Sequence, residues 1–146
     1  MTEALGLDAR PANGWRNALG YWIAELADAT AVRELAPDPR KVKALGGPGV
    51  VVTAASDVAR FDFVSRSFAP NAGIDEDPVC GSAHCSLGPL WGARLGKTEL
   101  MANQVSPRGG VLRVRLSGDR VLLAGKALTV WRGELTEDAT RGMKAQ

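Results

Sequence analysis

Residues 74–85 read Ile-Asp-Glu-Asp-Pro-Val-Cys-Gly-Ser-Ala-His-Cys and are the most informative segment of the chain. Three carboxylates stop at Pro78, and a thiol, a glycine and a hydroxyl (Cys80, Gly81, Ser82) then open an apolar stretch of helical period. Small residues at a helix start leave the first backbone N–H groups uncovered, and these donors bind anions together with the helix dipole. The segment therefore combines an anion cradle, potential proton carriers and an acidic lip, which suits a small carboxylate substrate.

The helix that follows this segment is predicted over residues 81–95, and Gly96 is a natural C-terminal stop. Its large apolar side chains recur at helical spacing: Leu87, Leu90, Trp91 and Leu95. Such a stripe is typical of a helix packed in the core. Smaller residues between them let strands approach closely on several sides: Ala83, Gly88 and Ala93.

The flanking segments read mainly as strands. Predicted strands cover residues 21–27, 50–53, 61–68, 112–117 and 121–123, the last two joined by a turn at 117–119. Residues 127–131 extend this hairpin or add another strand. Upstream, residues 38–45 have helical character, residues 31–35 are ambiguous, and Pro11, Asn13 and Gly14 suggest a loop. Strands surrounding one apolar helix predict an α+β domain.

Length and composition indicate a single globular domain. The chain has 146 residues, 45% of them hydrophobic and 23% charged, which predicts one domain over residues 1–137 and a frayed tail over 138–146. The net charge of +2 comes from scattered Lys and Arg residues, so we expect no nucleic-acid partner. No apolar run has membrane-spanning length, and the N-terminus lacks a signal peptide pattern. We therefore expect a cytoplasmic protein without a membrane partner.

The cysteine and histidine content argues against structural cross-links. Cys80 and Cys85 are five residues apart, which on a helix places them on different faces and forbids a mutual disulfide. His84 is the single histidine, and no zinc-ligand spacing is present, so no metal site is predicted. Reduced thiols in a reducing compartment fit best.

The stretch Asp77-Pro78-Val79-Cys80-Gly81-Ser82-Ala83-His84 resembles the signature of the phenazine-biosynthesis PhzF-like proteins, which share the diaminopimelate epimerase fold. Further matching pieces follow in family order: Asp62-Phe63, Arg66, Phe68-Ala69-Pro70, Gly73-Ile74, Gln104, Ser106, Arg108-Gly109-Gly110, Gly118-Asp119-Arg120-Val121 and Gly133-Glu134-Leu135. The resemblance spans nearly the whole chain. It implies one lobe of a two-lobe fold, the C-terminal one, in which a curved, mostly antiparallel sheet wraps around a central helix.

The resemblance also implies roles for residues of the signature. PhzF-like enzymes move a proton with a glutamate of the other lobe and no cofactor, supported by an aspartate and a serine that match Asp77 and Ser82. Epimerase relatives place a thiol where Cys80 stands, although many PhzF-like members carry threonine there. The backbone of Gly81 and Ser82 would bind the carboxylate.

Each of these residues also has a purely structural interpretation. Asp77 could cap a turn, Ser82 could be an ordinary helix N-cap, and Cys80 could be a small buried hydrophobic residue. We expect His84 to be packed and hydrogen-bonded rather than a base. The carboxylates of Asp75 and Glu76 are expected to be solvated.

The second candidate substrate-binding segment is Arg108-Gly109-Gly110. Two glycines free the backbone for close approach to a ligand, and Arg108 could pair with a carboxylate. The alternative is a simple turn into the strand that begins at Val111.

The chain departs from the family pattern because the first lobe has no counterpart here. That lobe would supply the proton-transferring glutamate and a histidine, and without it the site would be open to water. Three hypotheses follow: an isomerase lobe completed by a homodimer or by a separate chain bearing the N-terminal lobe, an inactive excised domain, or a non-catalytic module that binds a small carboxylate. An exposed apolar face would favour pairing, and Trp15, Trp22 and Trp131 could contribute to it, although we expect a core position for each of them.

Overall fold

The structure is a computed structural model that describes residues 1–134 and 136. The strands of its sheet are β1 (Asn13–Arg16), β2 (Trp22–Glu25), β3 (Val50–Ala55), β4 (Phe63–Ala69), β5 (Ile74–Asp77), β6 (Glu99–Gln104), β7 (Gly110–Ser117) and β8 (Arg120–Ala124). The helices are α1 (Ala29–Glu34), α2 (Pro39–Ala44) and α3 (Gly81–Leu95), with single 3₁₀ turns at η1 (Glu3–Leu5) and η2 (Pro70–Ala72). The chain is thus a mixed α/β domain with few helices.

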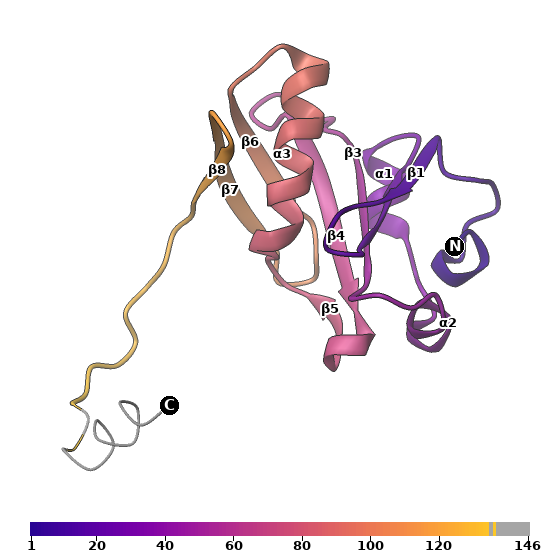
Figure 1. Ribbon diagram of the computed structural model, residues 1–146, viewed down its shortest axis with the longest axis horizontal. Coiled ribbons are helices and arrows are strands. Elements are labelled where there is room, and N and C mark those ends of the chain that lie inside the picture. Colours follow the sequence, from indigo (N-terminus) through magenta and orange to yellow (C-terminus); the bar gives the residue numbers. More distant parts are fainter. Residues whose placement is uncertain (135, 137–146) are drawn as a thin grey trace.

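One curved, open sheet of eight strands organises the molecule (Figure 1). Its strand order is β1-β2-β3-β4-β6-β7-β8, and β5 pairs with the free part of β4. Neighbouring strands are antiparallel except for the β2–β3 and β4–β6 pairs, which are parallel. The expectation of a mostly antiparallel sheet is therefore confirmed.

The sheet is buried on both faces in its centre, and β3 shows why. Val51 packs under α3, whereas Val50 and Val52 pack toward α1 and α2 on the opposite face. Successive strand residues point to opposite faces, so a strand covered on both sides reads as a continuous apolar run. The valines of residues 50–53 are this run, and helices cover both faces of the sheet at this point (Figure 1).

The long helix has the predicted bounds. It begins after Cys80, ends at Leu95, and is closed by Gly96, whose φ of 64° is the left-handed conformation that glycine adopts without strain. Two of its glycines, Gly88 and Gly92, allow the sheet to approach, and a Cβ on Gly88 would lie 2.8 Å from a methyl group of Val114 in β7. A Cβ on Gly92 would lie 2.5 Å from Leu116 of β7 and 2.9 Å from the carbonyl oxygen of Lys97.

Several sequence predictions need correction. The suggested loop around Asn13 is strand β1, and the ambiguous residues 31–35 lie mostly in α1. Strands β5 and β6 were not predicted. Residues 127–131 form no strand and leave the body as an extended segment (Figure 1). The frayed tail predicted for 138–146 lies outside the described residues.

The tryptophans also differ from expectation in part. Trp15 and Trp22 are partly buried and pack against the two core clusters, as predicted for core positions. Trp131 is 79% exposed, so a core position for it is wrong. No helix within the described part of the chain combines the length and apolar character needed to cross a membrane.

Candidate functional site

The candidate site is built on the N-terminus of α3. Cys80 is the N-cap residue, with an extended backbone (φ −93°, ψ 108°), and its side chain makes no capping hydrogen bond. Gly81 and Ser82 follow it and are exposed. A fifteen-residue helix whose first N–H groups are left open is a favourable place for an anion. The structural interpretation of Ser82 as the N-cap is wrong, because that position belongs to Cys80.

Cys80 is both a core residue and a member of this helix start. It is 6% exposed and packs in the cluster beneath α3, as a small hydrophobic side chain does. Its Sγ atom lies 3.3 Å from Oγ of Ser82. Cys85 is exposed, and both cysteines are free, as predicted.

Asp77 ends β5 and precedes the turn into α3. Its Oδ1 accepts the N–H of Val79 at 3.0 Å, so the carboxylate caps this turn. The capping interpretation is therefore confirmed. The hydrogen bond from Val79 uses one of the two carboxylate oxygens of Asp77. No other hydrogen bond to the carboxylate occurs among the described residues.

His84 is packed, as expected. The imidazole is fully buried, its Nδ1 lies 2.7 Å from the carbonyl oxygen of Cys80, and its Nε2 lies 3.5 Å from Oγ of Ser65. A carbonyl can only accept, so Nδ1 carries the proton and donates it. Burial lowers the pKa of this histidine below its usual value, while the bond to Cys80 acts weakly in the other direction. The ring is thus a neutral structural element of the first turn.

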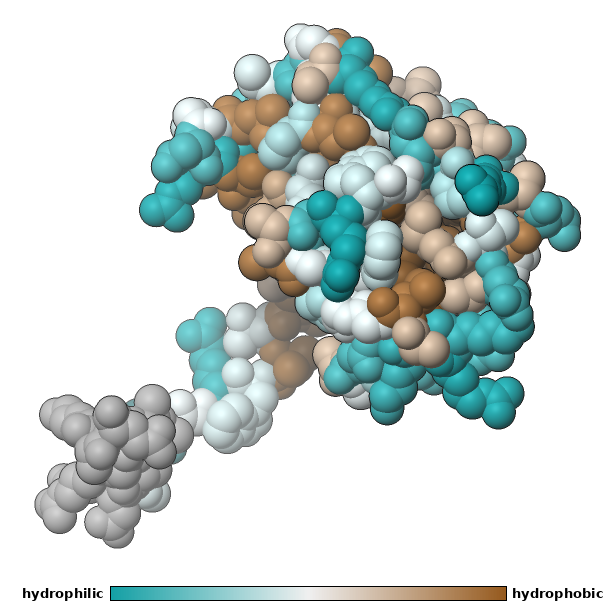
Figure 2. Space-filling model, turned by 45° about the vertical axis from the view of Figure 1, so that its right-hand side comes forward, coloured by the Kyte–Doolittle hydropathy of each residue, from teal (hydrophilic) through white to brown (hydrophobic). Residues whose placement is uncertain are grey.

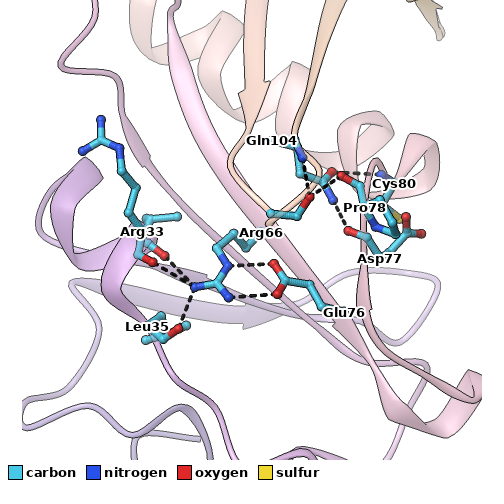
Figure 3. A network of polar contacts seen from close by, with 11 residues as sticks. Arg33, Leu35, Arg66, Glu76, Asp77, Pro78, Cys80 and Gln104 are labelled. Atoms are coloured by element: carbon cyan, nitrogen blue, oxygen red, sulfur yellow. Dashed lines mark hydrogen bonds and ion pairs between the residues drawn. The ribbon is translucent and has the colours of Figure 1, made fainter. Parts of the chain in front are cut away.

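Glu76 is not the solvated lip residue that was expected. Its two carboxylate oxygens accept from Nε and Nη2 of Arg66 at 2.7 and 2.9 Å (Figure 3). The remaining terminal nitrogen of Arg66 donates to the carbonyl oxygens of α1 and the residue after it: Val32, Arg33 and Leu35. Arg66 therefore fastens β5 to the end of α1. Asp75 is exposed, as predicted.

The Arg108-Gly109-Gly110 segment forms the predicted turn into β7. Gly109 has a φ of 69°, and a Cβ on Gly110 would lie 2.2 Å from a methyl group of Val79. Arg108 is exposed on the rim of a hollow of about 480 Å³. The hollow is lined by Val79, Arg108, Gly109, Gly110, Val111, Leu112, Gly125 and Lys126.

The predicted site residues therefore fall into two neighbouring groups. Asp77, Cys80, Gly81 and Ser82 surround the start of α3, and none of them lines the hollow beside Arg108. Val79 joins the two groups, because it lies on the turn into α3 and also in the hollow's wall. Among the described residues no group of three or more His, Cys, Asp or Glu side chains could hold a metal ion.

Arg66, Gln104 and Ser106 had no predicted role in the site and were named only as residues that match the family. All three are buried polar residues, and each binds the segment that leads into α3. A buried polar side chain must find partners, but those partners are distant in the sequence. The available signal was Arg66, a charged residue inside the strand predicted over residues 61–68, whereas Gln104 and Ser106 lie outside every predicted strand.

Comparison with known proteins places these features in a family. The model of the PhzC-PhzF family, described as phenazine biosynthesis-like protein, matches residues 2–133, and the chain belongs to this family. A protein of Halalkalibacterium halodurans named as an uncharacterized isomerase is 44% identical over 130 residues, covering 89% of this chain and 49% of that protein. A Pseudomonas aeruginosa protein with the same kind of name is 46% identical over 135 residues, covering 92% of this chain and 50% of its own length.

Solved structures agree with the fold. The crystal structure of a PhzF-family protein from Enterococcus faecalis matches with a TM-score of 0.78 and 44% identity, covering 85% of this chain and 46% of that chain. The chain thus spans about half the length of the relatives that it matches.

Proposed function

We propose that this chain is the C-terminal lobe of a PhzF-like isomerase, which moves a proton on a small carboxylic acid without a cofactor once a second lobe completes the site. The observation that carries the proposal is the uncapped start of α3, where Cys80 and Ser82 lie next to each other and Asp77 stands on the preceding turn. Two relatives of about twice this length are named isomerases, which agrees with the proposed reaction class.

The proposed chemistry is proton abstraction beside a carboxylate. The open N–H groups of Gly81 and Ser82 hold the carboxylate, so that the electron pair left by the departing C–H proton is stabilised as it spreads onto the acid. A base accepts that proton, and an acid returns one to the same or a neighbouring carbon. Asp77, Ser82 and Cys80 are the candidates that this lobe supplies, and Arg108 with its two glycines offers a neighbouring anchor for the rest of the ligand.

A second lobe is part of the proposal because the site is open on one side. Gly81 and Ser82 are exposed, and water at that surface would weaken every charge interaction they make. The segment after β8 also projects apolar side chains into solvent: Leu128 is 85% exposed and Val130 is 88% exposed. Figure 2 shows such apolar residues on the projecting segment. We propose that a second copy or a separate N-terminal-lobe chain covers them.

Proton exchange in deuterated water tests the proposed function. The protein is incubated with a panel of small α-amino and unsaturated carboxylic acids, and deuterium incorporation is followed by mass spectrometry. We expect incorporation into at least one acid and at least a hundredfold slower exchange in Asp77→Asn. Cys80→Ala, tested alongside, reports whether the thiol takes part. Unchanged exchange in Asp77→Asn would overturn the role of this carboxylate.

The second candidate function is a non-catalytic module that binds a small carboxylate. It is favoured by the open α3 start in a chain half as long as its relatives. Saturable binding of an acid by the dimeric protein, in which a second copy supplies the other lobe, with no deuterium incorporation into the bound acid, would select this alternative over the isomerase.

A further inference from the structure

The turn that joins β5 to α3 carries two of the candidate catalytic residues and has little hydrogen bonding of its own. It runs from Asp77 to Cys80, and Pro78 contributes no N–H. Its backbone groups are instead met by side chains, one of which is the carboxylate of Asp77 itself. What holds the turn from outside therefore decides where Asp77 and Cys80 stand.

Gln104 binds both ends of this turn. Its Nε2 donates to the carbonyl oxygen of Asp77 at 2.5 Å, and its Oε1 accepts the N–H of Cys80 at 2.9 Å (Figure 3). The side chain is fully buried at the end of β6. A single planar amide thus spans the turn with one donor and one acceptor.

The backbone of Gln104 is itself fixed on both sides. It pairs with Ser65 of β4 in a parallel ladder and with Gly110 of β7 in an antiparallel one. A side chain on a strand held from two sides is more precisely placed than one on a loop. Among the natural side chains of this length, an acid offers no donor at neutral pH and an aliphatic chain offers neither group.

Ser106, in the loop that follows β6, adds a further hydrogen bond to this turn. Its hydroxyl donates to the carbonyl oxygen of Pro78 at 2.7 Å and accepts the N–H of Gly109 at 3.0 Å. The loop that carries Arg108 is therefore bonded to the turn that carries Asp77. A shift of either segment would therefore strain a hydrogen bond of Ser106.

We infer that Gln104 is a positioning residue that fixes the turn from Asp77 to Cys80 and so sets the geometry of the candidate site. The catalytic meaning of this role rests on the proposed function. The placement of the turn does not, and it can be tested without any substrate.

The thiol of Cys80 is the reporter for this test, because it is 6% exposed while the turn is in place. Cys85 is exposed, so the experiment uses a Cys85→Ser background in which Cys80 is the remaining thiol. Alkylation by iodoacetamide is followed by mass spectrometry at fixed pH and in low, non-denaturing urea. Gln104→Met removes both bonds at nearly constant volume, and Gln104→Glu keeps an acceptor for Cys80.

We expect Gln104→Met to raise the alkylation rate of Cys80 at least tenfold, with Gln104→Glu in between. The increase should be independent of urea, because opening of the turn exposes little other surface. Thr53→Val is the matched control. Thr53 is fully buried and also makes two hydrogen bonds, to Val64 and Trp91, but none to the turn.

Equal alkylation rates in Gln104→Met and Thr53→Val, or a rate that rises steeply with urea in both, would overturn the inference and leave Gln104 as an ordinary stabilising residue. If Gln104→Met does not fold, Ser106→Ala takes its place in the experiment, because Ser106 also bonds this turn. An alkylation rate of Cys80 in Ser106→Ala no higher than in Thr53→Val would contradict the inference that these side chains fix the turn. Failure of proton exchange would leave this result unaffected, since alkylation needs no turnover.

Discussion

The guanidinium of Arg66 is buried between β5 and the end of α1, and its charge is balanced by Glu76. A buried ion pair adds little over a well-packed apolar pair, but removal of one partner leaves an uncompensated charge. This asymmetry makes the pair sensitive to single substitutions. It also explains why an acidic residue stands in a strand that borders the candidate site.

Glu76→Gln should therefore lower the free energy of unfolding by about 3 kcal/mol. Urea denaturation followed by circular dichroism measures this change. The exposed ion pair between Lys41 and Glu3 provides the control, and Glu3→Gln should change little. Equal, small effects of the two substitutions would show that Arg66 is not buried as described.

His84 predicts a pH dependence of stability. Its pKa is lowered by burial in the folded state, so the unfolded chain binds the proton more readily. The associated stability is present above the unfolded pKa of about 6.5 and is lost as pH falls toward the folded value, by up to about 1.4 kcal/mol per pH unit. Urea titrations between pH 7.5 and 5.5 should show this slope, and His84→Asn should abolish it. An unchanged slope in the variant would assign it to other groups.

At the scale of elements, the close approach of α3 and β7 depends on glycine. A Cβ on Gly92 meets both a flexible side chain, that of Leu116, and a rigid backbone oxygen, that of Lys97. The side chain can move, but the backbone cannot do so without shifting the end of the helix. Small residues in α3 are thus part of how the sheet packs on it.

We expect Gly92→Ala to destabilise the domain by up to about 2 kcal/mol, although alanine favours a helix over glycine by about 1 kcal/mol. Gly81→Ala is the control in the same helix, because its added Cβ meets nothing closer than 3.7 Å. Thermal unfolding of both variants distinguishes the effects. A higher melting temperature for Gly92→Ala would mean that the contact with β7 relaxes freely.

At the scale of the whole molecule, the projecting segment after β8 is the feature that an isolated domain does not explain. Leu128, Val130 and Trp131 are all more than three-quarters exposed. Exposed apolar residues grouped in this way mark interaction surfaces. Burial by a second lobe is the arrangement that our proposed function requires.

Light scattering should therefore find a species of twice the 15.4 kDa chain mass if two copies pair. Trp131→Ser should shift the association to at least tenfold higher concentration, because a large aromatic anchor is removed from the interface. Arg132→Ser, at the exposed neighbouring position, is the control. A monomer at all concentrations would point instead to a separate chain that supplies the missing lobe.

Helices and strands could be predicted from the sequence where their signal lies in residues that are close together along the chain. The period of residues 81–95 and the glycine after them predicted α3 to the residue, and the valine run predicted β3. Both signals come from side chains that are neighbours along the chain. The open helix start at Cys80 could be foreseen for the same reason.

The tertiary structure decided whatever depends on partners distant in the sequence. Strand β5 is rich in acids and lacks strand propensity, yet it forms because β4 offers an edge and Arg66 neutralises Glu76. Residues 127–131 have strand propensity, but no described strand pairs with them, so they form no strand. Backbone pairing and the burial of charge both require a neighbour in space. For that reason the sequence by itself determines the helix α3 and its open N-terminal end. The assembled fold determines how Gln104, Arg66 and Glu76 hold the site.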